Sequence, residues 1–145
     1  MSKQSTINSL HTLVTLRGKD VDRLQADLSG KTSVRDRYRA NLERLAGLCA
    51  DSGASGALPM ALSLNCDNYK QAVLQIADSH RNDLHLHEAD MAVTQQALQQ
   101  AWRKREVLGQ VLAQKQNTLA NEQQQREQKQ QDEVGVQAWY RSQRG

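Results

Sequence analysis

Three histidines and two carboxylates lie within nine residues in the middle of the chain: His80, His85, His87, Asp83 and Glu88. Asp83 and His87 are four residues apart, so on a helix they would share one face, as metal ligands on helices do. A closed site needs a third and a fourth ligand from the first helix, which is expected to offer none near these residues except Asp27 or Asp36. We therefore interpret these histidines as solvated residues or as residues of a helix-helix seam, and we predict no metal site.

Residues 29–33 contain a Gly-Lys-Thr sequence, which also ends phosphate-binding loops. The glycine that such a loop requires is missing, because Gln25 stands five residues before Gly30, and no strand pattern precedes the sequence. No serine, threonine or cysteine stands in a visible triad context. We therefore predict no nucleotide site, no catalytic residue, no cofactor and no enzyme activity.

Arg103, Lys104 and Arg105 form a short basic run directly after Trp102. A nucleic-acid-binding helix usually concentrates basic residues over a longer stretch, whereas acids are interspersed here, so we predict no nucleic-acid partner. Two interpretations remain. The run is either a solvated cationic face with Trp102 beside a helix seam, or a contact surface for an acidic protein partner.

Long helices are needed to position these residues. Residues 68–133 contain no proline and one glycine, and Ala, Leu, Gln, Glu, Arg and Lys fill most positions. Aromatic residues make up 3% of the 145-residue chain, and no alternating strand pattern appears. We predict an all-α fold: a long antiparallel two-helix coiled-coil hairpin with the second helix overhanging, in a single coiled-coil domain spanning residues 1–145.

Turn-forming residues divide the chain. The first helix is expected at about 3–49, a loop at about 50–63, the second helix at about 64–133 and a tail at 134–145. The loop contains the chain's only proline, Pro59. Asp51 or Ser52 to Gly53 would stop the first helix, and Ser63, Asn65 or Asp67 would cap the second.

Apolar residues repeat every seven positions along both helices, which predicts a left-handed coiled coil. Gly18 and Gly30 fall outside this repeat and are candidate bend points. The predicted seam consists of Ile7, Leu10, Val14, Val21, Leu24, Leu28, Leu42, Val73, Leu84, Met91, Leu98 and Leu108.

Two antiparallel registers, one heptad apart, satisfy this pattern. The preferred register sets Leu24 near Met91, along with three further pairs: Ile7 with Leu108, Leu42 with Val73, and Cys49 with Cys66. In that register mild oxidation is expected to link the two cysteines. The competing register pairs Leu24 with Leu98 and Leu10 with Leu112, but it opposes Arg17 to Arg105.

Charge is distributed unevenly along the chain. Residues 1–50 hold nine basic and five acidic side chains, residues 51–102 two and six, and residues 103–145 eight and five. The acidic part of the second helix is expected to face a basic run in the first: Lys31, Arg35, Arg37, Arg39 and Arg44. Such exposed pairs fix orientation more than stability.

No stretch of about 18 apolar residues is present, and residues 1–10 lack the apolar core of a signal peptide. We therefore expect cytoplasmic residence, which also suits the two cysteines. Residues 121–133 contain no apolar side chain, and a helix polar on all sides has nothing of its own to pack against. Apolar residues return at Val134, Val136, Trp139 and Tyr140.

This organisation resembles the FliJ family of flagellar type III export apparatus stalk proteins, with their injectisome relatives. The resemblance covers nearly the whole chain: a short first helix, a small-residue loop and a longer second helix. Three motifs add to it: Asn68-Tyr69 with Gln71, Trp102 followed by Arg103 and Lys104, and residues 128–133, which resemble the family's Gln-Lys-x-x-Asp-Glu signature.

The resemblance implies a non-catalytic coupling protein that is largely monomeric alone and is peripherally associated with the inner-membrane export apparatus. Its implied partners are the type III export ATPase hexamer, the cytoplasmic domain of the export gate membrane protein, and export chaperones. The end with both termini would insert into the ATPase ring, promote ring assembly and couple hydrolysis to proton-driven export. Chaperone recycling would be a further role.

Carried onto this chain, the gate contact would fall on Asn68, Tyr69 and Ile76, although Ala72 is smaller than the family's usual residue there. The ring contact would involve Arg103, Lys104, Gln128, Lys129, Asp132 and Glu133. Three alternatives stay open: an injectisome stalk protein, a dedicated type III export chaperone that sheathes a secreted helix, and a self-associating architectural coiled coil.

Overall fold

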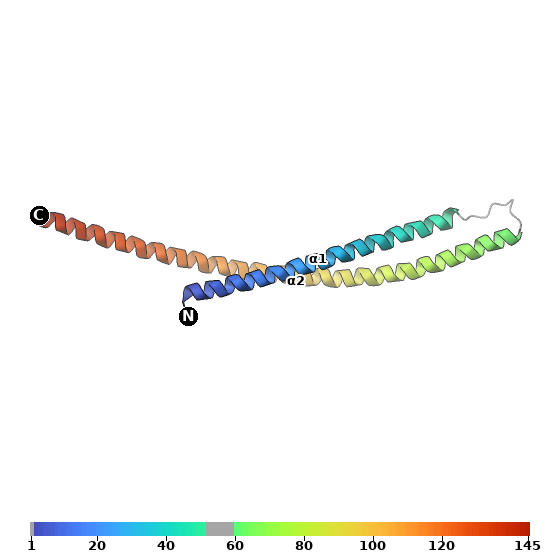
Figure 1. Ribbon diagram of the computed structural model, residues 1–145, viewed down its shortest axis with the longest axis horizontal. Helices are drawn as coiled ribbons and strands as arrows, with labels where there is room; N and C mark the ends of the chain where they lie inside the picture. Colours follow the sequence, from blue (N-terminus) through green and yellow to red (C-terminus); the bar gives the residue numbers. More distant parts are fainter. Residues whose placement is uncertain (1, 52–59) are drawn as a thin grey trace. The chain divides into compact units, whose positions relative to one another are not determined.

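The computed structural model describes residues 2–51 and 60–145, apart from the side chains at positions 61 and 63. These residues form two α-helices, α1 (Lys3–Asp51) and α2 (Met60–Arg144), and no strand occurs in the two described ranges (Figure 1). The all-α prediction is confirmed. Most of the predicted loop, residues 52–59, lies outside the described residues.

The first helix starts and stops where its sequence supplies signals. The backbone amide of Ser5 donates a hydrogen bond to the Ser2 hydroxyl oxygen at 3.2 Å, so Ser2 caps the first turn of α1. At the other end α1 reaches Asp51, two residues beyond the predicted end at about residue 49 and next to the predicted stop signal. Gly18 and Gly30 do not interrupt it, because the cost of one helical glycine is only about 1 kcal/mol.

The second helix is longer at both ends than the sequence predicted. It begins at Met60, so Ser63, Asn65 and Asp67, the three positions predicted as its start, lie inside it. The segment predicted as a tail, residues 134–145, is helical to Arg144.

The described residues group into two compact units. The hairpin unit consists of Val21–Gln100, and the terminal unit consists of Met1–Asp20 together with Ala101–Gly145. In each unit a segment of α1 runs antiparallel along a segment of α2, as the colours of the ribbon show (Figure 1).

Each unit has a narrow apolar seam as its core. Val21 is the most deeply buried residue, with 2% of its surface exposed. All twelve predicted seam residues are buried or half-buried. The buried seam residues of the hairpin unit are Val21, Val73, Ala77, Leu84, Met91 and Thr94, and those of the terminal unit are Ile7 and Leu112.

Contacts in both units fix the register. In the hairpin unit the Tyr38 ring lies between His80 and His87, with centroid distances of 4.6 and 5.9 Å. In the terminal unit a methyl group at Gly18 would lie 3.9 Å from Cδ of Arg105. Both observations match the register that sets Leu24 opposite Leu98. The register preferred from the sequence is therefore wrong by one heptad.

The objection to the observed register was the approach of Arg17 to Arg105. Each arginine has an acidic neighbour on its own helix: Arg17 lies 3.6 Å from Asp20, and Arg105 lies 3.8 Å from Glu106. Both arginines are also half-exposed, so water screens their repulsion. The approach of these two arginines therefore does not exclude the observed register.

Neither helix, over its described residues, has an apolar stretch long enough to cross a membrane.

Candidate protein-binding surfaces

Lys31 forms a polar cross-link inside the seam of the hairpin unit. Its Nζ donates to the Thr94 hydroxyl at 2.8 Å and lies 2.9 Å from the Asp90 carboxylate and 3.4 Å from that of Asp27. The hydrogen bond to Asp90 is the main cause that raises the pKa of Lys31 above its ordinary 10.5. Lys31 thus acts within the helix pair, and its Gly-Lys-Thr context lies in the middle of α1.

The histidines divide between the seam and the surface. His87 Nε2 donates to the backbone carbonyl of Lys31 at 2.7 Å, His80 packs on Tyr38, and His85 is exposed. Within residues 2–51 and 60–145 no group of three His, Cys, Asp or Glu side chains is arranged to hold a metal ion. The interpretation as seam histidines therefore holds for His80 and His87.

The predicted attraction between the basic run of α1 and the acidic part of α2 appears at two positions. Lys31 pairs with Asp90, and Arg39 lies 3.4 Å from Glu88. Arg35 instead pairs with its neighbour Asp36. The Arg39–Glu88 pair is exposed, so it orients the helices more than it stabilises them.

The predicted gate contact is an exposed stripe on α2 of the hairpin unit. Asn68, Tyr69 and Ile76 are all exposed, and Tyr69 and Ile76 are seven residues apart on the same face. Leu62, seven residues before Tyr69, is exposed on that face too. The heptad spacing that identified the seam also identifies Leu62, which our sequence analysis missed.

Two residues of the predicted ring contact, Arg103 and Lys104, line a groove in the terminal unit. The groove has a volume of about 380 Å³, and Val107 and Leu108 give it apolar walls. Arg17 of α1 completes the rim. The groove therefore combines three cations with apolar surface. The sequence did not associate Arg17 with this site, because the association depends on the observed register.

The remaining predicted ring-contact residues lie further along α2, and all four are exposed: Gln128, Lys129, Asp132 and Glu133. Lys104 and Gln128 are separated by about 36 Å along a helix that rises 1.5 Å per residue. The structure does not bring the two groups together. The two groups of predicted contact residues lie on separate segments of the same helix.

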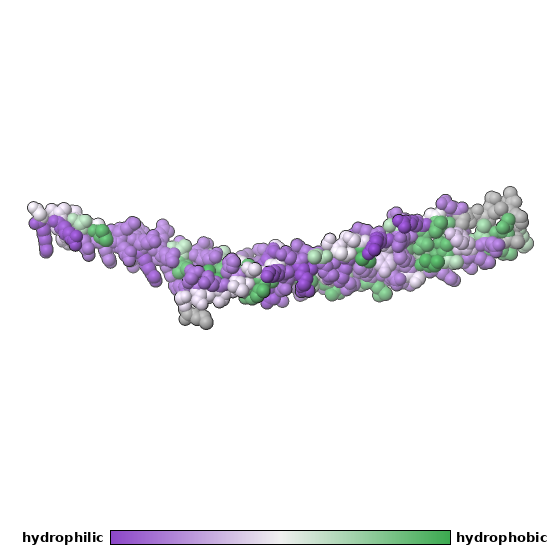
Figure 2. Space-filling model, in the orientation of Figure 1, coloured by the Kyte–Doolittle hydropathy of each residue, from purple (hydrophilic) through white to green (hydrophobic). Residues whose placement is uncertain are grey.

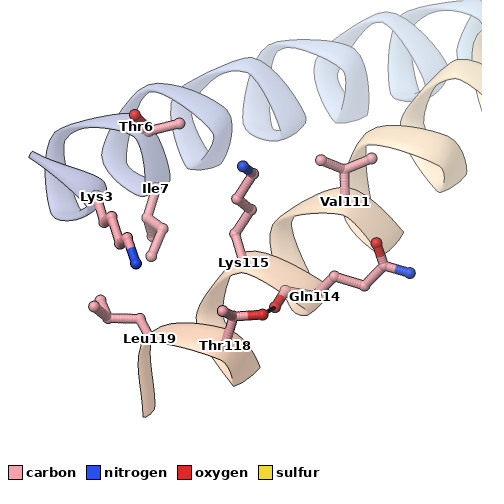
Figure 3. A pocket seen from close by; sticks show the side chains of 8 residues that line it. All are labelled: Lys3, Thr6, Ile7, Val111, Gln114, Lys115, Thr118 and Leu119. Carbon is pink, nitrogen blue, oxygen red and sulfur yellow. Dashed lines mark hydrogen bonds between the residues drawn. The ribbon is translucent and has the colours of Figure 1, made fainter. Parts of the chain in front are cut away.

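Near the N-terminal end of α1, an ion pair joins α1 to α2, and a groove lies beside that pair. Lys3 Nζ lies 2.6 Å from the Glu122 carboxylate, and this lysine is the main cause that lowers the pKa of Glu122. Beside the pair lies a groove of about 390 Å³, where Ile7, Val111 and Leu119 supply apolar surface (Figure 3).

Beyond Glu122, α2 continues for 22 residues to Arg144, and every one of them is exposed. Figure 2 shows this part of α2 mostly in hydrophilic colours, with hydrophobic atoms returning toward the C-terminus. We call residues 123–144 the α2 extension. The overhang predicted for the second helix is confirmed, and it is longer than expected.

The two long helices, their narrow seam and the solvent-exposed α2 extension define a protein of the coiled-coil hairpin class. A comparison with protein-family models matches residues 6–144 to the family described as flagellar FliJ protein. The chain belongs to the FliJ family, and so to the proteins of flagellar type III export. No curated protein and no solved structure was found to match it.

Proposed function

We propose that this chain is a non-catalytic stalk and coupling protein of the flagellar type III export apparatus. Its α2 extension enters the ring of the export ATPase, and the exposed stripe of the hairpin unit contacts the cytoplasmic domain of the export gate. The observation that carries the proposal is the α2 extension: 22 exposed helical residues in a member of the FliJ family.

The chemistry of the extension supports a protein partner. An isolated helix in water is marginal unless packing stabilises it, and residues 123–133 offer no apolar side chain to this chain's own core. Glutamine, lysine and acidic side chains can pair with a polar ring surface that changes during ATP hydrolysis. Contacts that differ between states of the ring are what coupling requires.

The cationic groove of Arg17, Arg103 and Lys104 supports a second contact with an acidic surface of the same partner. The exposed stripe of Leu62, Tyr69 and Ile76 suits the gate, because a heptad-spaced apolar row on a helix fits an apolar groove. Export chaperones are further partners in this proposal. The protein acts in the cytoplasm, at the inner-membrane export apparatus.

The test measures ATP hydrolysis by the purified export ATPase. The full chain should raise the rate, a chain truncated after Glu122 should not, and Leu86→Ala should behave as the full chain. Leu86 is a suitable control because it is exposed on α2 of the hairpin unit, away from the extension. Unchanged hydrolysis with the full chain, together with capture of a secreted helix, would instead identify an export chaperone.

A further inference from the structure

The last turns of α2 carry four large apolar side chains that pack on no other helix of the described chain. Val134, Val136, Trp139 and Tyr140 expose 65, 53, 57 and 60% of their surface. We call these four residues the terminal cluster. Exposed aromatic residues grouped in this way are typical anchors of protein interfaces, since burying each one releases a large apolar area.

The cluster is a defined arrangement. The rings of Trp139 and Tyr140 lie 5.3 Å apart at 75°, an edge-to-face packing that aromatic pairs prefer. The Ser142 hydroxyl donates to the carbonyl of Trp139 at 2.7 Å, within the last turn of α2. The two rings therefore contact each other and together form one exposed aromatic surface.

The directions of the four side chains indicate the shape of the partner. At 100° per residue, Val136, Trp139 and Tyr140 lie on one side of the helix, and Val134 lies about 160° from Val136. A flat surface, such as a bilayer, would cover one side only and leave Val134 in water. A partner that surrounds the helix covers all four.

The charge of the last turns indicates the partner's polarity. After Glu133 the only charged side chains are Arg141 and Arg144, both in the last turns of α2. An opening with acidic residues at the depth of these arginines would complement them, and complementary charge favours both encounter and orientation.

The cluster also lies clear of α1. The ion pair between Lys3 and Glu122 joins the two helices at the end of α1, and Val134 follows twelve residues later, about 18 Å further along α2. A surrounding partner therefore meets a single helix there.

We propose that the terminal cluster is the anchor by which the ATPase ring holds this chain, through an opening lined with apolar side chains and bordered by acidic ones. This inference rests on the proposed function and places the strongest contact at residues 134–140, beyond the polar residues 128–133. The polar residues then contribute orientation, and the cluster contributes most of the affinity.

A single-tryptophan chain tests the proposal directly. Trp102→Phe leaves Trp139 as the only indole, and addition of the ATPase hexamer should shift its emission to shorter wavelength as the ring leaves water. A shift that instead appears on concentrating the chain alone, or with phosphatidylserine vesicles but not with the hexamer, would overturn the proposal in favour of self-association or membrane binding.

Affinity provides the second measurement. Trp139→Ala and Tyr140→Ala should each weaken binding to the hexamer about tenfold to hundredfold, while Val93→Ala, an exposed valine of the hairpin unit, should leave it unchanged. Trp139→Ala and Tyr140→Ala should both leave folding intact, since Trp139 and Tyr140 are exposed and alanine favours helix. If Trp139→Ala and Tyr140→Ala both bind the hexamer with wild-type affinity and still stimulate ATP hydrolysis, the proposal of the terminal cluster as anchor is wrong and the proposed function stands. Absence of both binding and stimulation would overturn the proposed function itself.

Discussion

At the scale of single residues, the seam of the hairpin unit is defined by its polar members as much as by its apolar ones. Lys31 reaches across to Asp90 and Thr94 and also accepts a hydrogen bond at its own carbonyl from His87. Polar residues at seam positions are satisfied in one alignment only, so they specify register at some cost in stability. Thr94, 6% exposed, is satisfied by Lys31 and by the Asp90 carbonyl.

The raised pKa of Lys31 predicts a loss of stability in alkaline solution. Because the folded-state pKa lies above the ordinary 10.5, the stabilisation is fully present below pH 10.5 and is lost as the pH rises through the folded-state value. Thermal melting followed by circular dichroism should therefore show a falling midpoint in that range. Lys31→Gln should show a smaller fall, and an equal fall in both chains would contradict the assignment.

A second prediction concerns the most buried side chain. Val21→Ala removes two methyl groups from the seam and should lower the free energy of unfolding by about 1.6 kcal/mol. Val93→Ala, on the exposed side of α2, should change it by less than about 0.5 kcal/mol. Urea unfolding of the two variants makes the comparison. Equal midpoints would show that Val21 is not part of the seam.

At the scale of elements, both helices contain glycines whose places accept a side chain. A methyl group at Gly30 or Gly109 would meet nothing within 4 Å. Gly30→Ala and Gly109→Ala should therefore each stabilise the protein by up to about 1 kcal/mol, because alanine restricts the unfolded chain and favours helix. Higher urea midpoints for both variants would confirm this. A lower midpoint for either would indicate that the glycine bends its helix.

The observed register predicts which cysteine pairs can form. In a chain with Cys49 and Cys66 replaced by alanine, Leu24→Cys with Leu98→Cys should oxidise to a disulfide. Leu24→Cys with Met91→Cys should not, because those positions are one heptad, about 10 Å, out of alignment. Mobility on a non-reducing gel distinguishes the two. The expected link between Cys49 and Cys66 depended on the other register, and the observed register gives no support for it.

The elements show what the sequence could and could not predict. Heptad spacing identified the seam and the overhang, because burial of an apolar stripe is a local property of each helix. The register depends on pairs from distant parts of the chain, and the repulsion expected between Arg17 and Arg105 is offset by the acidic neighbour of each arginine. The ends of the second helix were missed because Asn65 and Asp67 resemble caps but lie inside α2, and because the predicted tail, residues 134–145, is helical to Arg144.

At the scale of the whole molecule, the α2 extension should be dispensable for folding and essential for partners. Its residues are all exposed and its last link to α1 is the pair of Lys3 with Glu122. A chain that ends after Glu122 should therefore unfold at the same urea concentration as the full chain, with a proportionally smaller helical signal. A large drop in midpoint would show that the extension supports the fold.

The polar layer around Lys31 has one mechanical consequence. A force that slides α1 along α2 within the hairpin unit would separate Lys31 from Asp90 and Thr94. It would also break the hydrogen bond from His87 to the Lys31 carbonyl before the apolar residues reached a new register. The layer therefore resists sliding of one helix along the other. A force applied to α1 is transmitted to α2 instead of shifting the register. Force spectroscopy on this unit should record one abrupt rupture in the force-extension curve. With Lys31→Leu the extension should instead increase gradually with force.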